Sequence, residues 1–331
     1  MELIGQGIQD YLAGRSLPEF KSRPPWFGGD LQTLRNSFTK APAPLRADDR
    51  LAAPIDVGAI SVAVNCPQVP YGTDRLLLLV HGLGGNEDSS YMINAARYFT
   101  AQGYTVGRMN YRGVGPSKEM SEPPYSAGLT SDLRAVIRWL HKKWPGHDIF
   151  LMGFSLGGQL SLRMLGEGDV PHGLKACVSV SAPLDLATSQ RKLERRRNWA
   201  YSRYVVGNMR ADLAGLVHPK VHVEPEKLKS VIAFDEQVIA PVFGFKDAAD
   251  YYARVSCLPL LGNVKLPTLA IHAADDPWIP VEDYRRAEWP TEAPAGAVIT
   301  PSGGHVGFHS QTSRSPWHEV AASSFFDLVG G

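Results

Sequence analysis

Cysteine is scarce in this chain, and its pattern excludes two common ways of stabilising a small fold. Cys66, Cys177 and Cys257 stand far apart, and none belongs to a Cys-x-x-Cys motif. The sequence therefore indicates neither a disulfide framework nor a structural zinc site. A chain of 331 residues can bury about three-quarters of its unfolded surface, so its core needs neither device.

Long hydrophobic runs and an excess of one charge are also absent. The longest aliphatic run, residues 76–80, is far shorter than the ~20 residues that span a bilayer. The first residues, MELIGQGIQDYLAG, lack the basic and apolar regions of a secretory signal. With 34 basic and 33 acidic side chains the net charge is +1, which argues against a nucleic-acid partner. We expect a soluble, cytoplasmic globular protein, and the sequence leaves its oligomeric state open.

Apolar segments of strand length alternate with helical patterns along most of the chain. Strand patterns occur at 55–64, 75–81, 104–111, 149–154, 176–180, 266–272 and 297–299, and helical patterns at 92–101, 133–144, 156–165 and 316–329. Continuous apolar strands that alternate with helices are typical of a parallel sheet covered on both faces. The sequence therefore predicts an α/β fold with a mostly parallel central sheet.

Two regions depart from this alternation. Residues 1–50 are rich in proline and arginine, and we expect an N-terminal arm that packs on the core, irregular except for a short helix near 32–38. Residues 183–263 have helical patterns without alternating strands, over a length too great for a plain connection. We predict a helical cap there, over the sheet edge where open α/β sheets bind ligands. Residues 51–182 and 264–331 would then form the core.

A Gly-x-Ser-x-Gly motif at 153–157 lies between a predicted strand and a predicted helix. A strand-to-helix turn this tight strains its central residue, and the flanking glycines remove side chains that would collide, so Ser155 projects from the turn. A glycine-rich turn capped by serine would contain the same residues. The strand–turn–helix context favours Ser155 as a nucleophile.

A nucleophilic serine needs a base and a group that orients the base, and both follow in the chain order typical of this turn. His305 lies in a Gly-Gly-His loop after a predicted strand, and we predict it as the base, with His309 as the alternative. Asp275 and Asp276 follow another predicted strand. We favour Asp276 as the acid because its Asp-Pro-aromatic-Ile-Pro turn resembles the acid loop of many α/β hydrolases, but the two roles could be reversed.

Attack on an ester creates an oxyanion, and each fixed N–H donor stabilises it by about 3–4 kcal/mol. We expect one donor at Leu156, which follows the serine at a helix N-terminus. The second should be the N–H of Leu83, in the glycine-rich loop 81–85 after the strand pattern at 75–81. This loop lacks the motifs of a phosphate-binding loop, so we do not favour phosphate as its ligand.

Together these motifs resemble the YheT-like branch of the α/β hydrolases, from about residue 24 to the C-terminus. The matching positions are Trp26, 31–34, 81–85, 90–91, 110–113, 153–158, 275–277 and 303–308. The resemblance implies a serine esterase, lipase or acyltransferase that acts on acyl esters without a cofactor. Asp30 and Gln159 stand where the family commonly has histidine and asparagine, and these departures bear on substrate shape more than on chemistry.

The sequence favours a carboxylic-ester hydrolase that acts on short- to medium-chain acyl esters or acylglycerol-type lipids. Two alternatives remain open: an alcohol acyltransferase with the same triad, and a non-catalytic lipid-binding module. Large apolar residues of the predicted cap favour an apolar acyl pocket, with a lining drawn from Trp199, Tyr201, Tyr204, Phe234, Val242, Phe243 and Phe245.

The stretch 191–210 carries seven basic residues and a single acid, Glu194. We expect a basic amphipathic helix here, and such a helix has two uses. It packs its aromatic face on the acyl pocket as a lid, or it rests on an anionic membrane surface as a weak peripheral contact. The sequence favours the lid and leaves the membrane contact open.

A cluster of residues that ligate metals elsewhere follows at His218, His222, Glu224 and Glu226. Pro219 and Pro225 break any helical spacing among them, and no further motif supports a metal. We therefore predict neither a metal nor an organic cofactor.

Overall fold

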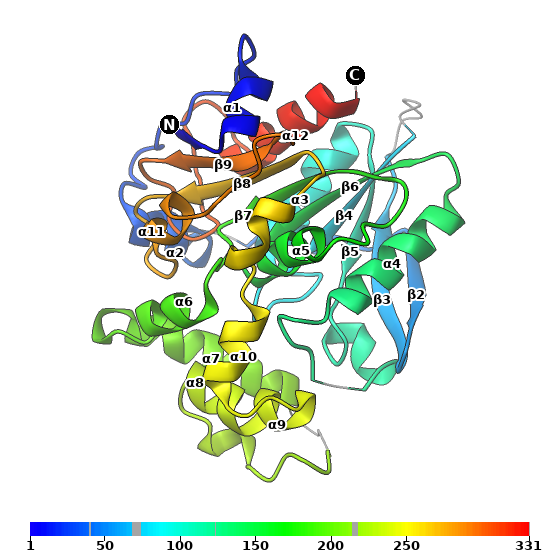
Figure 1. Cartoon of the computed structure of the whole chain (residues 1–331), viewed down its shortest axis with the longest axis vertical. Helices are drawn as coiled ribbons and strands as arrows, with labels where there is room; N and C mark the ends of the chain where they lie inside the picture. Colours follow the sequence, from blue (N-terminus) through cyan, green and yellow to red (C-terminus); the bar gives the residue numbers. More distant parts are fainter. Residues whose placement is uncertain (40, 68–73, 123, 214–217, 331) are drawn as a thin grey trace.

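The computed structural model describes residues 1–39, 41–67, 74–122, 124–213 and 218–330. A nine-stranded sheet runs through the molecule in the order β1-β9-β8-β7-β6-β4-β5-β3-β2 (Figure 1). Its strands are β1 (Glu2–Ile4), β2 (Asp49–Ile55), β3 (Gly58–Asn65), β4 (Arg75–Val80), β5 (Thr105–Met109), β6 (Asp148–Phe154), β7 (Leu174–Val180), β8 (Thr268–Ala273) and β9 (Ala295–Thr300). Strands β4 to β9 pair in parallel, whereas β1, β2 and β3 are antiparallel to their neighbours. The predicted, mostly parallel sheet is confirmed.

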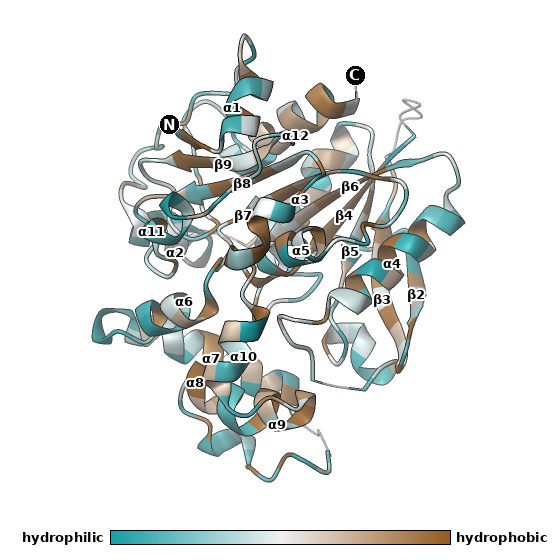
Figure 2. Cartoon of the chain, in the orientation of Figure 1, coloured by the Kyte–Doolittle hydropathy of each residue, from teal (hydrophilic) through white to brown (hydrophobic). Residues whose placement is uncertain are grey.

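Helices cover both faces of the sheet. One face packs against α1 (Gln6–Leu12), α3 (Ser90–Ala101) and α12 (Trp317–Gly330), and the other against α4 (Thr130–Lys143), α5 (Leu156–Glu167) and α11 (Val281–Arg285). Alternate leucines of β4 enter the two cores in turn, which explains why this strand is apolar throughout (Figure 2). No helix among the described residues is long and apolar enough to cross a membrane.

The N-terminal arm is more regular than predicted. Strand β1 pairs with β9 and extends the sheet by one strand, α1 follows it, and α2 (Gly29–Phe38) begins three residues before the predicted helix. The expectation of an irregular arm with a single helix was therefore wrong. A strand of three residues is too short to show a period of two in the sequence, and here it covers the edge of β9 that would otherwise be unpaired.

Between β7 and β8 the chain forms a set of helices, which we call the helical segment (residues 183–263, of which 214–217 lie outside the described residues). It contains α6 (Leu186–Leu193), η2 (Arg196–Asn198), α7 (Trp199–Leu213), η3 (Pro225–Lys227), α8 (Val231–Phe234), η4 (Asp235–Ile239), α9 (Ala240–Phe243), α10 (Ala248–Val255) and η5 (Leu258–Asn263). In Figure 1 helices α6 to α10 lie below β7, β8 and β9 and to the left of β2 and β3.

The single basic helix expected over 191–210 is wrong. Helix α6 ends at Leu193, and α7 starts only at Trp199 after the short turn η2. The break has a tertiary cause, because the Asn198 amide donates to the carbonyl oxygens of Lys192, at 2.9 Å, and of Pro277, at 2.7 Å. A continuous helix would leave those carbonyls without this donor.

Candidate active site

Ser155 occupies a strained turn between β6 and α5. Its φ of 51° and ψ of −118° lie in a region that only glycine adopts without strain. A Cβ atom on Gly153 would stand 2.3 Å from the Gly157 carbonyl oxygen, and one on Gly157 would stand 2.4 Å from that of Val80. Both glycines are therefore required for the chain to pass this closely, and the strain falls on the serine between them.

His305 and Asp276 lie in line with this serine. The His305 Nε2 atom is 3.0 Å from Ser155 Oγ, and its Nδ1 atom is 2.9 Å from Asp276 Oδ2. The other Asp276 oxygen accepts the N–H groups of Trp278 and Ile279 at 2.7 and 3.0 Å. Burial raises the pKa of Asp276, but the His305 and His272 imidazoles and the Ile279 N–H together lower it by more, so the pKa lies below its usual value. The structure thus brings together the three residues named from the sequence.

Asp275 and His309, which the sequence offered as the alternative acid and the alternative base, take no part in these hydrogen bonds. Asp275 accepts the Gly304 N–H at 2.9 Å, and burial raises the pKa of its carboxyl. His309 is buried, and its Nε2 atom has no hydrogen-bond partner among the described residues. Burial lowers the pKa of His309 to about 3. Neither side chain is hydrogen-bonded to Ser155 in the described structure.

Two residues of α2 that had no assigned role hold the loop of His305. The Thr33 hydroxyl accepts the His305 N–H at 2.8 Å. The Gln32 side-chain amide forms two hydrogen bonds with the backbone of His309. It accepts the His309 N–H at 2.6 Å and donates to the His309 carbonyl at 3.1 Å. The loop needs this support because Val306 and Phe308 have positive φ values of 59° and 48°. The Leu-Gln-Thr motif was the signal for these residues, but their partners lie more than 270 residues away.

Leu83 and Leu156 carry the two N–H groups expected to bind an oxyanion. Tyrosine hydroxyls accept the N–H groups of Gly82 and Gly84 at 3.0 and 3.1 Å. The Leu83 N–H between them, and the Leu156 N–H at the start of α5, have no acceptor among the described residues. A Cβ atom on Gly82 would lie 3.1 Å from Ser155 Cβ, so the loop passes directly beside the serine.

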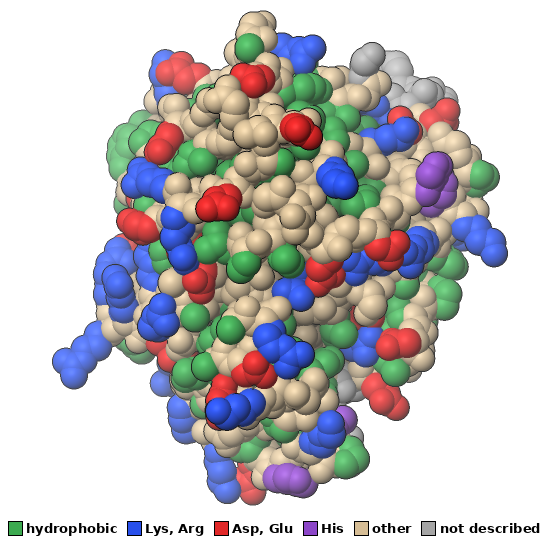
Figure 3. Space-filling view, in the orientation of Figure 1, with side chains coloured by type: hydrophobic (Ala, Val, Ile, Leu, Met, Phe, Trp, Pro, Cys, Tyr) green, Lys and Arg blue, Asp and Glu red, His purple; other side chains and the backbone are tan. Residues whose placement is uncertain are grey.

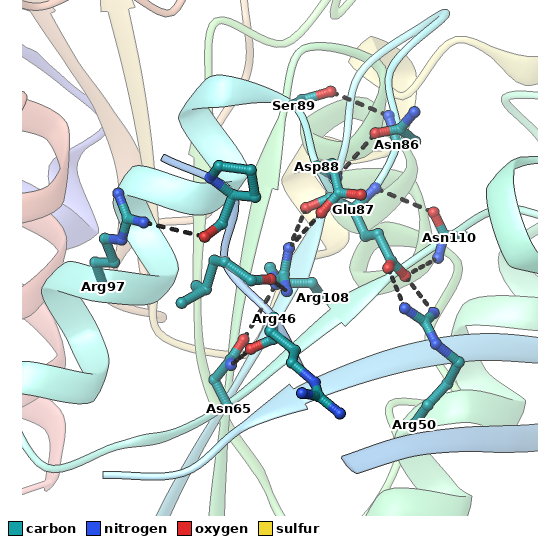
Figure 4. Close-up of polar contacts among 12 residues, drawn as sticks. Arg46, Arg50, Asn65, Asn86, Glu87, Asp88, Ser89, Arg97, Arg108 and Asn110 are labelled. Atoms are coloured by element: carbon teal, nitrogen blue, oxygen red, sulfur yellow. Dashed lines mark hydrogen bonds and ion pairs between the residues drawn. The ribbon is translucent and has the colours of Figure 1, made fainter. Parts of the chain in front are cut away.

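A charged network around the buried Glu87 carboxylate fixes the far end of the Leu83 loop (Figure 4). Arg50 donates to both oxygens of the Glu87 carboxylate, at 2.5 and 2.8 Å, and Asn110 donates to one of them at 2.6 Å. Arg108 is fully buried and donates to the Glu87 carbonyl at 2.7 Å. Burial raises the pKa of Glu87, and these hydrogen bonds lower it by more. A buried charge is retained when it is paired in this way, and the backbone around it becomes fixed.

Side chains of the helical segment hold the loop of Asp276. The Lys192 ammonium donates to the carbonyls of Asp276 and Ile279 at 2.8 and 2.9 Å, and Asn198 donates to that of Pro277. Burial lowers the pKa of Lys192. These partners are 79 to 87 residues apart in the sequence, so no local pattern reveals them. The position of the helical segment therefore bears directly on the Asp276 loop.

A cavity of about 680 Å³ reaches Ser155, His305, Leu83 and Leu156. The helical segment contributes much of its wall through α6, α7, α8 and α10. Of the lining residues expected from the sequence, Tyr201, Tyr204 and Phe234 line the cavity, whereas Trp199, Val242, Phe243 and Phe245 do not. The prediction was wrong for these four residues. Trp199 is exposed on α7, and the part of the helical segment between Ile239 and Tyr251, which contains the other three, contributes no residue to the cavity wall.

The two departures from the family pattern both contact the helical segment. Asp30 accepts a hydrogen bond from Tyr201 at 3.0 Å and pairs with Arg197 at 2.5 Å, which joins α2 to α7. Gln159 donates to the Val255 carbonyl at 2.8 Å and joins α5 to α10. Both positions therefore influence how the cavity wall is held.

The remaining candidate ligands do not converge. Within the described ranges, no three His, Cys, Asp or Glu side chains are arranged to hold a metal, and this includes the cluster at 218–226. The three cysteines are free thiols. The chemistry of this site is therefore argued from Ser155 and its neighbours alone.

Comparison with known proteins identifies the family. A family model described as alpha/beta hydrolase fold matches residues 75–311. The chain belongs to this α/β-hydrolase family. Its relatives include the putative esterase YheT of Escherichia coli, 31% identical over 72% of each chain. Phospholipase ABHD3 of Mus musculus is 28% identical over 84% of this chain and 70% of its own. The monoacylglycerol lipase of Saccharomyces cerevisiae is 27% identical over 76% of this chain and 59% of its own.

Solved structures share the fold of this α/β hydrolase. The Pyrococcus furiosus esterase Pf2001 has a TM-score of 0.57 and 17% identity, over 88% of this chain and 97% of its own. The 2,6-dihydroxy-pseudo-oxynicotine hydrolase has a TM-score of 0.58 and 20% identity, over 91% of this chain and 72% of its own. The resemblance to YheT-like proteins is confirmed, and the named relatives support ester hydrolysis as the class of reaction.

Proposed function

We propose that this α/β hydrolase cleaves carboxylic esters with Ser155 as nucleophile, His305 as general base and Asp276 as the acid that orients the base. The observation that carries the proposal is the continuous line of hydrogen bonds from Ser155 Oγ through the His305 ring to Asp276, at 3.0 and 2.9 Å. Distances of this size allow proton transfer between the serine and the imidazole.

The reaction proceeds through an acyl-enzyme. Ser155 Oγ attacks the ester carbonyl while His305 Nε2 takes its proton, and the negative oxygen binds the N–H groups of Leu83 and Leu156. When the tetrahedral intermediate collapses, His305 returns the proton to the departing alcohol. Water then attacks the acyl-serine by the same route and releases the acid. Asp276 stabilises the positive imidazole in both halves of the reaction.

The cavity favours esters with an apolar acyl part and a polar alcohol part. Its volume of about 680 Å³ falls in the range of small-molecule sites, and its wall is rich in apolar and aromatic side chains. Polar groups interrupt this wall, among them the Asp235 carboxyl, which accepts the Tyr252 hydroxyl at 2.6 Å. Burial raises the pKa of Asp235 to about 7. Short- to medium-chain acyl esters and acylglycerol-type lipids match this combination.

Labelling with a fluorophosphonate probe tests the nucleophile. We expect a single modified peptide that contains Ser155. Ser155→Ala and His305→Ala should each lower kcat on a short-chain ester by roughly 10⁴ to 10⁶ with little change in folding. Ser324→Ala changes a serine on α12, which the cavity does not reach, and should keep both labelling and activity.

The same assay separates the alternative activities. Added glycerol or ethanol would compete with water for the acyl-enzyme, and acylated alcohol as the main product would indicate an acyltransferase. The absence of both labelling and turnover across short and medium acyl esters would leave a lipid-binding module instead. Full activity of Ser155→Ala would reject the proposed nucleophile.

A further inference from the structure

The cavity meets the surface beside the start of α7. Most of its lining residues are buried or half-buried, and the lining residues classed as exposed are Arg197, Ala200 and Tyr204. Helix α2 lies against this stretch, because Asp30 holds both Arg197 and Tyr201. The described structure therefore has the cavity opening next to α2 and the first turns of α7.

Helix α2 presents an apolar stripe at this opening. Leu31, Leu34 and Phe38 are spaced i, i+3 and i+7, so they share one side of the helix. Leu34 lines the cavity, whereas Leu31 is 41% and Phe38 65% exposed. Phe27, just before the helix, is 57% exposed. The stripe thus continues from the cavity wall onto the outer surface, with no partner among the described residues to cover it.

Helix α7, which begins two residues after the ion pair of Arg197 with Asp30, adds two exposed aromatic side chains. Trp199 is 66% and Tyr204 65% exposed, and Tyr204 also lines the cavity. Exposed hydrophobic side chains that are grouped rather than scattered mark interaction sites. Here they come from two helices far apart in the sequence.

Three unpaired arginines lie within and just before the first turns of α7. Arg195, Arg196 and Arg203 are exposed and form no ion pair within the described residues. Figure 3 shows Lys and Arg side chains gathered along the left edge of the molecule, where α6 and the turn before α7 lie. The positive charge complements an anionic partner, and the aromatic side chains suit a surface that is apolar below a polar layer.

We propose that this surface, the entry face (Phe27, Leu31, Phe38, Trp199 and Tyr204 with Arg195, Arg196 and Arg203), docks on an anionic lipid–water interface. The aromatic and aliphatic side chains would enter the headgroup layer, and the arginines would bind the anionic headgroups. The proposal rests on the proposed function, since its use is to let an acyl ester pass from the lipid into the cavity. Charge complementarity and the adjoining cavity favour lipid over a protein partner.

Sedimentation of the full chain with vesicles tests this docking. We expect at least about tenfold tighter binding to phosphatidylcholine vesicles that contain about one-third phosphatidylglycerol than to phosphatidylcholine alone. Because exposed charges are screened by salt, the difference should largely disappear near 1 M NaCl, at about 3 Å screening length. Absence of binding to both kinds of vesicle would overturn the proposal.

Two variants divide the surface into its charged and apolar parts. Arg195→Gln/Arg196→Gln/Arg203→Gln should weaken binding to anionic vesicles by roughly a hundredfold, since each charge near the surface contributes about fivefold. Leu31→Ser/Phe38→Ser should weaken binding to both vesicle types. The matched controls, Arg314→Gln and Met120→Ser, change exposed residues elsewhere and should bind as the unmodified chain does.

Hydrolysis of a water-soluble short-chain ester distinguishes this proposal from the proposed function. None of the substituted residues lines the cavity, so all variants should keep this activity. If the unmodified chain hydrolyses no ester, the proposed function fails while vesicle binding still tests the docking. Unchanged vesicle binding by the triple arginine variant would overturn the proposal. So would a concentration-dependent dimer that Leu31→Ser/Phe38→Ser dissociates, because a second copy would then cover this face.

Discussion

At the scale of single residues, Asp275 and Asp276 are adjacent carboxylates in different surroundings. Asp276 faces the His305 ring at 2.9 Å, and its second oxygen is held by two backbone N–H groups. Asp275 instead accepts the N–H of Gly304. A carboxylate on Nδ1 selects the imidazole tautomer that can accept the serine proton at Nε2, which supports the proposed role of Asp276 in orienting the base.

Asp276→Asn should therefore lower kcat on a short-chain ester by about 10⁴, because the amide favours the wrong tautomer and does not stabilise the imidazolium. Asp275→Asn keeps an oxygen for the Gly304 N–H and should cost much less. Steady-state kinetics of both variants check this, with circular dichroism as the test of folding. Equal losses in the two variants would contradict the assignment of Asp276.

At the scale of elements, the two loops beside Ser155 are each held by polar groups that do not line the cavity. The Leu83 loop after β4 depends on Glu87 and its partners on β2 and β5 (Figure 4). The Asp276 loop after β8 depends on Lys192 and Asn198 of the helical segment. Parallel strands end at one edge of the sheet, but the geometry of their loops is set by these neighbours.

Glu87→Gln removes the negative charge that Arg50 and Asn110 share while keeping the size of the side chain. We expect a kcat lowered by about tenfold to a hundredfold with KM nearly unchanged, because the Leu83 N–H acts mainly on the transition state. Initial-rate kinetics measure this split, and Glu122→Gln, at an exposed position, is the control. A raised KM with kcat unchanged would argue against a role for Glu87 in positioning the oxyanion donor.

Lys192→Met keeps the aliphatic stem and removes both donors to the Asp276 loop. The carbonyls of Asp276 and Ile279 would lose their partner, which should lower the free energy of unfolding by about 1–3 kcal/mol and lower kcat as the loop shifts. Denaturant unfolding and steady-state kinetics check the two effects. The exposed Lys229→Met is the control, and a Lys192→Met variant with normal kcat would show that the loop keeps its position unaided.

At the scale of the whole molecule, several histidines are buried inside the two cores. Burial lowers the pKa of His81 and His272 to about 4, and that of His318 to about 3. The His318 ring lies between those of Phe154 and Phe308, with centroids 5.6 Å from each. An unfolded chain binds a proton at such a histidine below about pH 6.5, whereas the folded chain does not. Each buried histidine therefore favours unfolding as the pH falls.

His318→Leu removes one of these groups, so its benefit should grow with acidity. The pKa of His318 is lowered in the folded chain, so protonation of this residue favours the unfolded chain. The free energy of unfolding of the unmodified chain is therefore unaffected by His318 above about pH 6.5, and it falls as the pH drops toward about 3. The quantity to compare is the free energy of unfolding of the variant minus that of the unmodified chain. This difference should be about 2 kcal/mol more favourable to the variant at pH 5 than at pH 7. Urea unfolding at both pH values measures this change. A difference independent of pH would mean that His318 binds a proton as readily in the folded chain as in the unfolded one.

Local patterns in the sequence were sufficient for the parallel core and for the strained serine turn. Continuous apolar strands indicate a sheet buried on both faces, and the glycines around Ser155 indicate a close approach of the backbone. Both features can be recognised from a few consecutive residues. No local pattern of this kind predicts the N-terminal strand or the break between α6 and α7. The same holds for the supporting roles of Gln32, Glu87 and Lys192.

The sequence by itself determined the strands and helices of the parallel core and which side chains carry reactive groups, because hydrophobic periodicity and turn chemistry act between near neighbours. Only the tertiary structure decided that Asp276 and not Asp275 faces His305, and that α2 meets α7 at the opening of the cavity. These outcomes depend on contacts between residues separated by tens to hundreds of positions. Such contacts stabilise the chain only after the sheet has brought these elements together.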